Sequence, residues 1–477
     1  MASPSSSSTA SVDRLSGRMW GALLVLCGAL FLDALDVSMI GVALPSIRTD
    51  LDMSTSSLQW VVSAYVLGYG GFLLLGGRAA DLLGRRRMFL ISLGVFIVAS
   101  ALGGLANDGA LLIATRFIKG VSAGFTAPAG LSIITTSFAE GPARNKALSI
   151  YAATGALGWS LGLVFSGLLT ELGWRWVFFV PAPFALATLI GAITLVPADK
   201  AVARTKRKFD IAGAVSVTTA MLLLVFTVVE APDQGWASLR TLGSFAIAAA
   251  IFATFVAIER RTDAPLVRLG ILRSGPLLRA NVGAMALIGS WFGFQFMLTL
   301  YLQSARGWSA LETGLALFPA GIIVATLAPR VAPLVARFGV TRVIAAGLTS
   351  MVAAYALFLP IGLNSGYVTA MVPTFILGGL AFGLAYGPLN IAATNGIAPE
   401  EQGLAGGLVN TSFQFGGALV LAIVTAVADA NGASDGSAQG LLDGFHAAIW
   451  VSLAAALIGV LAMVLPTRQR DVAVEPA

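Results

Sequence analysis

Four charged residues fall inside long apolar runs of the sequence, where a charge is expected only if it has a partner or a task. Asp33 and Asp36 lie in the first run, and Arg116 and Lys119 lie in the fourth. Each pair is three residues apart, so its two members share one face of a helix. A charge at a bilayer centre costs roughly 2.5–3.5 kcal/mol on insertion scales. We therefore expect the two acids and the two bases to contact one another.

Helix geometry places the two pairs at similar depths. At a rise of about 1.5 Å per residue, Asp36 lies roughly 4–5 Å from the middle of its run, while Lys119 and Arg116 lie roughly 3 Å and 7–8 Å from the middle of theirs, on the same side. Burial disfavours an ionised carboxylate and a nearby cation favours it, so such a cluster is suited to binding and releasing protons. Two alternatives stay open: a purely structural ion pair between two helices, and a Lys119 side chain that reaches the membrane interface instead.

The elements that must position these residues are membrane-spanning helices. The 477 residues are 57% hydrophobic and only 11% charged, against roughly 25% charged in soluble domains. Many runs reach the roughly 17–25 apolar residues that cross a bilayer as a helix. We predict an all-α polytopic membrane protein with spans near 19–47, 57–77, 88–107, 110–132, 146–169, 175–197, 211–230, 240–258, 280–303, 313–335, 341–363, 368–389, 404–428 and 444–466.

The spans form two near-equal blocks of six around an inserted pair, as in duplicated transporters. A weak internal repeat links the blocks, because Gly339 and Arg342 have the same spacing as Gly84 and Arg87. The predicted domains are a disordered tail 1–18, a six-helix bundle 19–197, linkers with two inserted helices 198–279, a six-helix bundle 280–466 and a tail 467–477.

The positive charge is distributed asymmetrically. On this span map four of the 29 Lys and Arg residues lie on one side of the membrane and two within a span, which leaves 23 on the other side. This positive-inside pattern predicts that both termini are cytoplasmic and argues against a nucleic-acid partner. One cysteine, Cys27, and one histidine, His446, exclude an internal disulfide and a metal-ligand cluster. With neither a P-loop nor a Ser/His/Asp constellation, we expect no enzyme and no ATP-driven motor.

Residues 77–87 read GRAADLLGRRR and follow the second span directly. This segment resembles the signature loop of the major facilitator superfamily, which latches the cytoplasmic gate. The resemblance implies that role for the following residues: Gly77, Asp81, Gly84, Arg85, Arg86 and Arg87. The alternative is a positively charged turn with no gating role.

Further segments narrow the resemblance to the fourteen-span drug:proton antiporter branch of that superfamily. Residues 35–45 read LDVSMIGVALP, 59–65 read QWVVSAY, 209–213 read FDIAG and 404–414 read LAGGLVNTSFQ, each similar to that branch. The resemblance implies a major facilitator fold, with two six-helix bundles plus a two-helix insert. It also implies that the first and fourth spans line a central cavity.

Two stretches depart from the branch. In the antiporter motif of span 5, Gly158, Gly162 and Gly167 remain for close helix packing, but Leu163 and Ser166 replace a proline and a glycine. In span 4 the usual glutamine is Lys119. Two acids and two bases leave the cavity near zero formal charge, so we expect zwitterionic, neutral or weakly anionic substrates to be preferred over dications.

Aromatic and amide side chains recur at helical spacing in the second bundle and mark a candidate substrate cavity, although such stripes also arise from ordinary packing. The candidates are Phe292, Gln295, Phe296, Thr299 and Gln303 in span 9, Tyr386 and Asn390 in span 12, and Asn410 and Gln414 in span 13.

The resemblance and the intramembrane charges together predict a proton-coupled antiporter that exports amphipathic small molecules such as drugs, antibiotics or secondary metabolites. It would work as a monomer in the cell membrane, driven by the proton gradient without a cofactor. A dedicated exporter of one endogenous metabolite or lipid and a proton-coupled importer are the alternatives. On this interpretation Asp36→Asn abolishes proton-driven transport and leaves folding intact.

Overall fold

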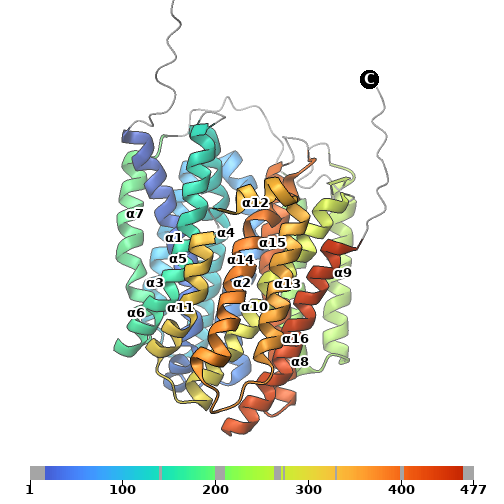
Figure 1. Ribbon diagram of the computed structural model, residues 1–477. Helices are drawn as coiled ribbons and strands as arrows, with labels where there is room; N and C mark the ends of the chain where they lie inside the picture. The colour runs from blue at the N-terminus through green and yellow to red at the C-terminus, as the bar shows by residue number, and fades with distance from the viewer. Residues whose placement is uncertain are drawn as a thin grey trace, which may run out of the picture.

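The computed structural model describes residues 17–138, 142–198, 210–262, 270–271, 274–327, 330–397 and 402–465. Within these residues, 14 helices are long and apolar enough to cross a membrane, and they stand side by side in one bundle (Figure 1). Helix α1 (Gly17–Asp50) begins and helix α16 (Ala438–Val464) ends at the same end of the bundle, the upper end in Figure 1, here called the termini side. The opposite end, here called the far side, carries Asp50 and Ala430.

The first half of the chain packs around α1 and α4. Helix α1 contacts α5 and α7, and α4 contacts α2 and α3. Apolar composition over the whole length explains these helices, since no polar face needs to meet water. Their bounds are α1 Gly17–Asp50, α2 Thr55–Leu83, α3 Arg85–Gly104, α4 Gly109–Ser137, α5 Pro142–Leu172, α6 Trp176–Phe179 and α7 Pro181–Leu195.

The second half packs around α10 in the same manner. Helix α10 contacts α15 and α16, and α13 contacts α14 and α16. The bounds are α10 Gly275–Leu300, η2 Tyr301–Ala305, α11 Ala310–Leu327, α12 Val331–Phe338, α13 Val340–Phe358, η4 Tyr367–Met371, α14 Val372–Thr394, α15 Gln402–Ala430 and α16 Ala438–Val464.

The inserted helices α8 (Ile211–Gln234) and α9 (Leu239–Glu259) pack on each other, and α8 contacts both α2 and α15. The insert therefore covers the junction of the two halves on one side of the bundle. Near the far side, Trp60 on α2 donates a hydrogen bond from Nε1 to Glu230 on α8 at 3.0 Å. Apolar contacts of Val66 and Val225 continue this junction toward the middle of the helices.

Several predicted span ends differ from the helices by five residues or more. The tenth span was expected over 313–335, but α11 ends at Leu327 and the short helix α12 begins at Val331, with residues 328–329 outside the described part of the chain. The last span begins at Ala438 rather than 444, because the hydroxyl of Ser437 caps α16 by accepting a hydrogen bond from the Gly440 amide.

The two halves are held together on the far side. Gln303 donates from Nε2 to the carbonyl of Val42 at 2.8 Å, and the Leu311 amide donates to Glu171 at 3.3 Å. On the opposite flank of the bundle, Thr425 donates to the side-chain oxygen of Gln59 at 2.5 Å. Each bond joins one half to the other, so the described conformation is closed at the far side.

Candidate functional site

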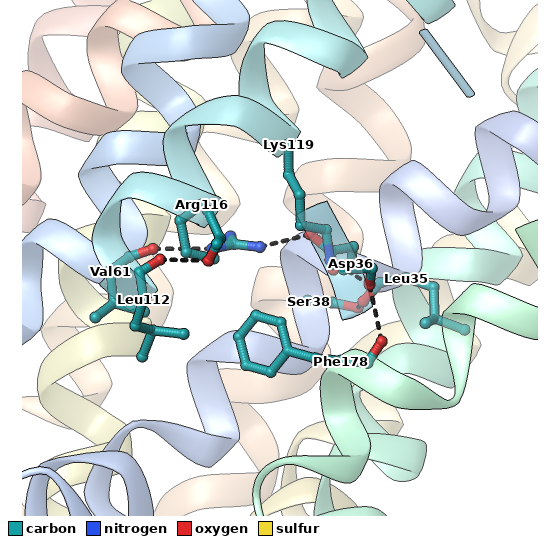
Figure 2. A network of polar contacts seen from close by, with 10 residues as sticks. Leu35, Asp36, Ser38, Val61, Leu112, Arg116, Lys119 and Phe178 are labelled. Atoms are coloured by element: carbon teal, nitrogen blue, oxygen red, sulfur yellow. Dashed lines mark hydrogen bonds and ion pairs between the residues drawn. The ribbon is translucent and has the colours of Figure 1, made fainter. Parts of the chain in front are cut away.

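Asp36 on α1 bridges the two cations of α4 (Figure 2). Arg116 Nη1 lies 2.5 Å from one carboxylate oxygen of Asp36, and Lys119 Nζ contacts the other oxygen. None of the three residues is more than 1% exposed. The predicted contact between an acid of span 1 and the bases of span 4 is thus confirmed, and it lies deep inside the first half.

Further partners hold both cations in place. Arg116 Nε donates to the carbonyl of Val61 at 3.0 Å, and Lys119 Nζ donates to Ser100 Oγ at 3.1 Å. The Lys119 amine also lies 4.6 Å from the ring centre of Phe96, a cation–π contact. The alternative in which Lys119 reaches the membrane interface is therefore wrong, because its amine is enclosed by these partners.

Asp33 stands apart from this cluster. It is 6% exposed, and its Oδ2 is buried without a hydrogen-bond partner among the described residues. It lies one helical turn before Asp36, which places it about 4.5 Å nearer the termini side. Asp36 and Lys119 still act on it electrostatically. The structure thus joins three of the four predicted charges directly and leaves the fourth beside them.

Glycines of span 5 let α5 approach two helices from opposite halves. A Cβ on Gly158 would stand 2.5 Å from the carbonyl oxygen of Phe31 on α1, and one on Gly162 would stand 2.8 Å from that of Leu35. A Cβ on Gly167 would stand 2.8 Å from the carbonyl oxygen of Ala310 on α11. Close packing at all three glycines is confirmed.

The two departures in that motif are accommodated. Leu163 is fully buried, and α5 runs without interruption from Pro142 to Leu172. Ser166 donates a hydrogen bond from its hydroxyl to the carbonyl of Met39 on α1. The serine that replaces a family glycine therefore adds a contact between α1 and α5.

The loop after span 2 is a sharp junction between two helices. Gly84 has φ = 102°, a backbone conformation that favours glycine, and it both ends α2 and begins α3. Gly339, its predicted counterpart, has φ = 83° between α12 and α13. The two junctions thus share a backbone feature, as the weak internal repeat predicts.

The three arginines of this junction form the first turn of helix α3. Arg86 donates to the carbonyl of Ile193 at the end of α7, while Arg85 is half-buried and Arg87 exposed. Gly77 lies on α2 beside Pro128 of α4. The Asp81 side chain lies outside the described residues, so its latch role stays a prediction.

The aromatic and amide stripe of α10 faces the first half but offers little open surface. Gln295 lies against Gly41 of α1, and Gln303 bonds to that same helix as described above. Thr299 is fully buried and bonds to its own helix at the Gln295 carbonyl, 3.0 Å away. Phe296 is 3% exposed, while Phe292 is half-buried.

The candidates on α14 and α15 are more accessible. Tyr386 is 44% exposed and stacks on Phe413 with ring centres 4.9 Å apart. Asn390 and Asn410 each donate to a carbonyl one turn back on their own helix. Gln414 packs against Gly70 of α2. Of these four, Tyr386 presents the largest open face.

Sequence reasoning missed an aromatic contact between the halves. Trp159 on α5 lies 5.8 Å from both Trp291 on α10 and Phe382 on α14, measured between ring centres. Trp291 and Phe382 are themselves 5.4 Å apart. Tryptophans are usually found at the ends of a span. Two tryptophans in the middle of spans could therefore have indicated a contact between helices in the sequence.

Two helical halves packed side by side, with a buried ionic cluster inside the first half, define the architecture of a polytopic membrane protein. The family model "Major Facilitator Superfamily" matches residues 26–421. The chain belongs to this superfamily.

Individual relatives agree with the family. The chain is 35% identical to the puromycin resistance protein pur8 of Streptomyces alboniger over 96% of this chain and 93% of that protein. It is also 35% identical to the cephamycin export protein CmcT of Amycolatopsis lactamdurans, over 94% and 93%. The crystal structure of the POT family transporter PepTSo superposes with a TM-score of 0.65 at 17% identity, over 92% of this chain and 97% of that one.

Proposed function

We propose that the protein exports antibiotics or similar amphipathic small molecules across the cell membrane in exchange for protons. The family and its exporting relatives support transport of this class of substrate. The observation that supports proton exchange is the group of four buried ionisable residues, in which one carboxylate oxygen, Asp33 Oδ2, lacks a hydrogen-bond partner among the described residues. Intramembrane ionisable residues of this kind mark ion and proton pathways.

The orientation that we propose follows from the positive charges of the loops. The termini side would face the cytoplasm, because the predicted loops on that side carry most of the Lys and Arg residues. The described conformation would then be closed toward the outside. Export requires that Gln303–Val42 and the other bonds of the far side break, so that substrate leaves outward while protons enter.

The exchange needs no cofactor, since the proton gradient supplies the free energy, and a monomer contains both halves of the site. A dedicated exporter of one endogenous product is a second candidate on the same fold. It is favoured by the similarity to the cephamycin export protein, which is named for a single class of product. Transport of a compound panel into proteoliposomes, with puromycin among the compounds, separates a broad exporter from a dedicated one.

A further inference from the structure

The two acids of α1 have opposite surroundings although they are one helical turn apart. Asp36 accepts bonds from a guanidinium and an ammonium group, one on each carboxylate oxygen. Asp33 makes no ion pair among the described residues, and its Oδ2 has no hydrogen-bond donor. This difference separates the roles of the two acids.

Protonating Asp36 would be costly in the described conformation. A neutral carboxyl group at that position would leave Arg116 and Lys119 as buried cations without a counter-charge, and an isolated buried ion carries a penalty of several kcal/mol. Asp36 is therefore suited to remain ionised and to hold α1 against α4.

Ionising Asp33 is the costly step in this conformation. A buried carboxylate with an oxygen that receives no hydrogen bond, here Oδ2, is disfavoured relative to its neutral form, and the ionised Asp36 nearby adds like-charge repulsion. With Asp33 neutral, the cluster of Asp36, Arg116 and Lys119 has a formal charge of +1. Loss of the Asp33 proton brings the four groups to zero. One proton thus changes the charge at the centre of the first half.

Titratable groups on four helices surround Asp33. On its own helix it faces Asp36, and on α4 it faces Lys119. On α2 the hydroxyls of Tyr65 and Tyr69 interact with it electrostatically, and on α5 that of Tyr151 does so.

Tyr69 and Tyr151 in turn interact with Tyr386 on α14, the accessible candidate of the second half. Asp33 therefore has the fixed ionic cluster as its charged neighbour and tyrosines of both halves in its wider surroundings.

We propose that Asp33 binds and releases the transported proton, while Asp36 stays ionised throughout as the fixed bridge between Arg116 and Lys119. This assignment rests on the proposed proton exchange. The carboxyl group gives its proton to water on the termini side and regains one from the far side once that side has opened. Only the proton is transferred: the O–H bond of Asp33 breaks as an O–H bond to water forms, and the reverse transfer occurs on the far side.

Infrared spectroscopy of the full-length protein in detergent tests the site without requiring transport. The C=O stretch of a protonated, buried carboxyl group should be present in the wild type at neutral pH and lost in Asp33→Asn. It should persist in the exposed-acid control Asp435→Asn and in the charge-balanced double variant Asp36→Asn/Lys119→Gln, which keeps Asp33. Persistence of the band in Asp33→Asn, its loss in the double variant, or its absence from the wild type would overturn the assignment.

Puromycin flux in proteoliposomes distinguishes this assignment from the proposed function. Asp33→Asn should lose the dependence of puromycin flux on a pH gradient that Asp435→Asn retains. A pH-driven flux in Asp33→Asn would contradict the assignment. A wild type that moves puromycin without any response to the gradient would contradict proton exchange itself, and the infrared titration would still show which acid holds a proton.

Discussion

Asp36 pairs with two buried cations at once, and this arrangement determines what substitutions in the cluster do. Arg116 and Lys119 contact Asp36 directly, and Lys119 also acts on Asp33. With Asp33 neutral, removing the charge of Asp36 raises the formal charge of the site from +1 to +2, whereas removing either cation lowers it to zero.

Asp36→Asn should lower stability as well as abolish proton-driven transport. The sequence alone predicted intact folding, but the two ion pairs show that the variant leaves two cations unpaired. Removing one partner of a buried ion pair costs about 3–5 kcal/mol. Thermal unfolding in detergent measures the loss, with Asp435→Asn as the control. An unfolding temperature equal to that of the wild type would show that the ion pairs contribute little.

Lys119→Gln should shift the pH dependence of transport to higher pH. The substitution removes a positive neighbour that favours the ionised acids, so they bind protons at lower proton concentration. Preference should also move toward monovalent cationic substrates. Lys146→Gln is a matched control, because that lysine is exposed. Superimposable pH–rate curves for wild type and Lys119→Gln would remove Lys119 from the mechanism.

At the scale of helices, α5 connects the two halves through small residues. Gly158 and Gly162 admit α1, whereas Gly167 admits α11 near the far side. Helix α5 therefore packs both against α1, which carries Asp36, and against α11, where the two halves meet on the far side.

Gly167→Ala should weaken closure of the far side and slow transport. Its methyl group would meet the backbone of α11, and overpacking of this kind costs about 1–3 kcal/mol. Spin labels at the exposed positions Leu172 and Leu315 would report a longer distance. Gly94→Ala is the control, because nothing lies within 4 Å of its Cβ. Unchanged distances and rates in Gly167→Ala would mean that closure does not depend on this contact.

Asp81→Asn should slow turnover while puromycin binding stays measurable. The predicted latch at the α2–α3 junction would weaken, and the central cavity would keep its side chains. Binding titrations and transport rates on the same preparation separate the two effects. Equal loss of binding and transport would instead indicate a folding defect.

Much of the helical arrangement could be predicted because lipid imposes simple rules on a chain. Long apolar runs can satisfy their backbone only as helices, and buried charges must pair, which brought Asp36 to Arg116 and Lys119. The sequence could not predict that Asp33 stays outside the ion pairs, because this depends on how the neighbouring helices pack around two acids on one helical face. The Trp159–Trp291 contact could not be predicted for the same reason, because it joins residues far apart in the sequence.

At the scale of the whole molecule, the two halves meet on the far side through bonds such as Gln303 to Val42. The insert helix α8 covers one of the two flanks at which the halves join. In the proposed transport cycle these far-side bonds must break before substrate is released. The proton on the α1 acids is the proposed source of the energy difference between the two states.

Transport driven by a proton gradient tests this account most directly. Purified protein in proteoliposomes of known orientation should accumulate puromycin against its concentration gradient only when protons flow in the opposite direction. The accumulation should collapse when a protonophore dissipates the pH gradient, and Asp33→Asn should show none. Accumulation that survives the protonophore would contradict proton-coupled export by this protein.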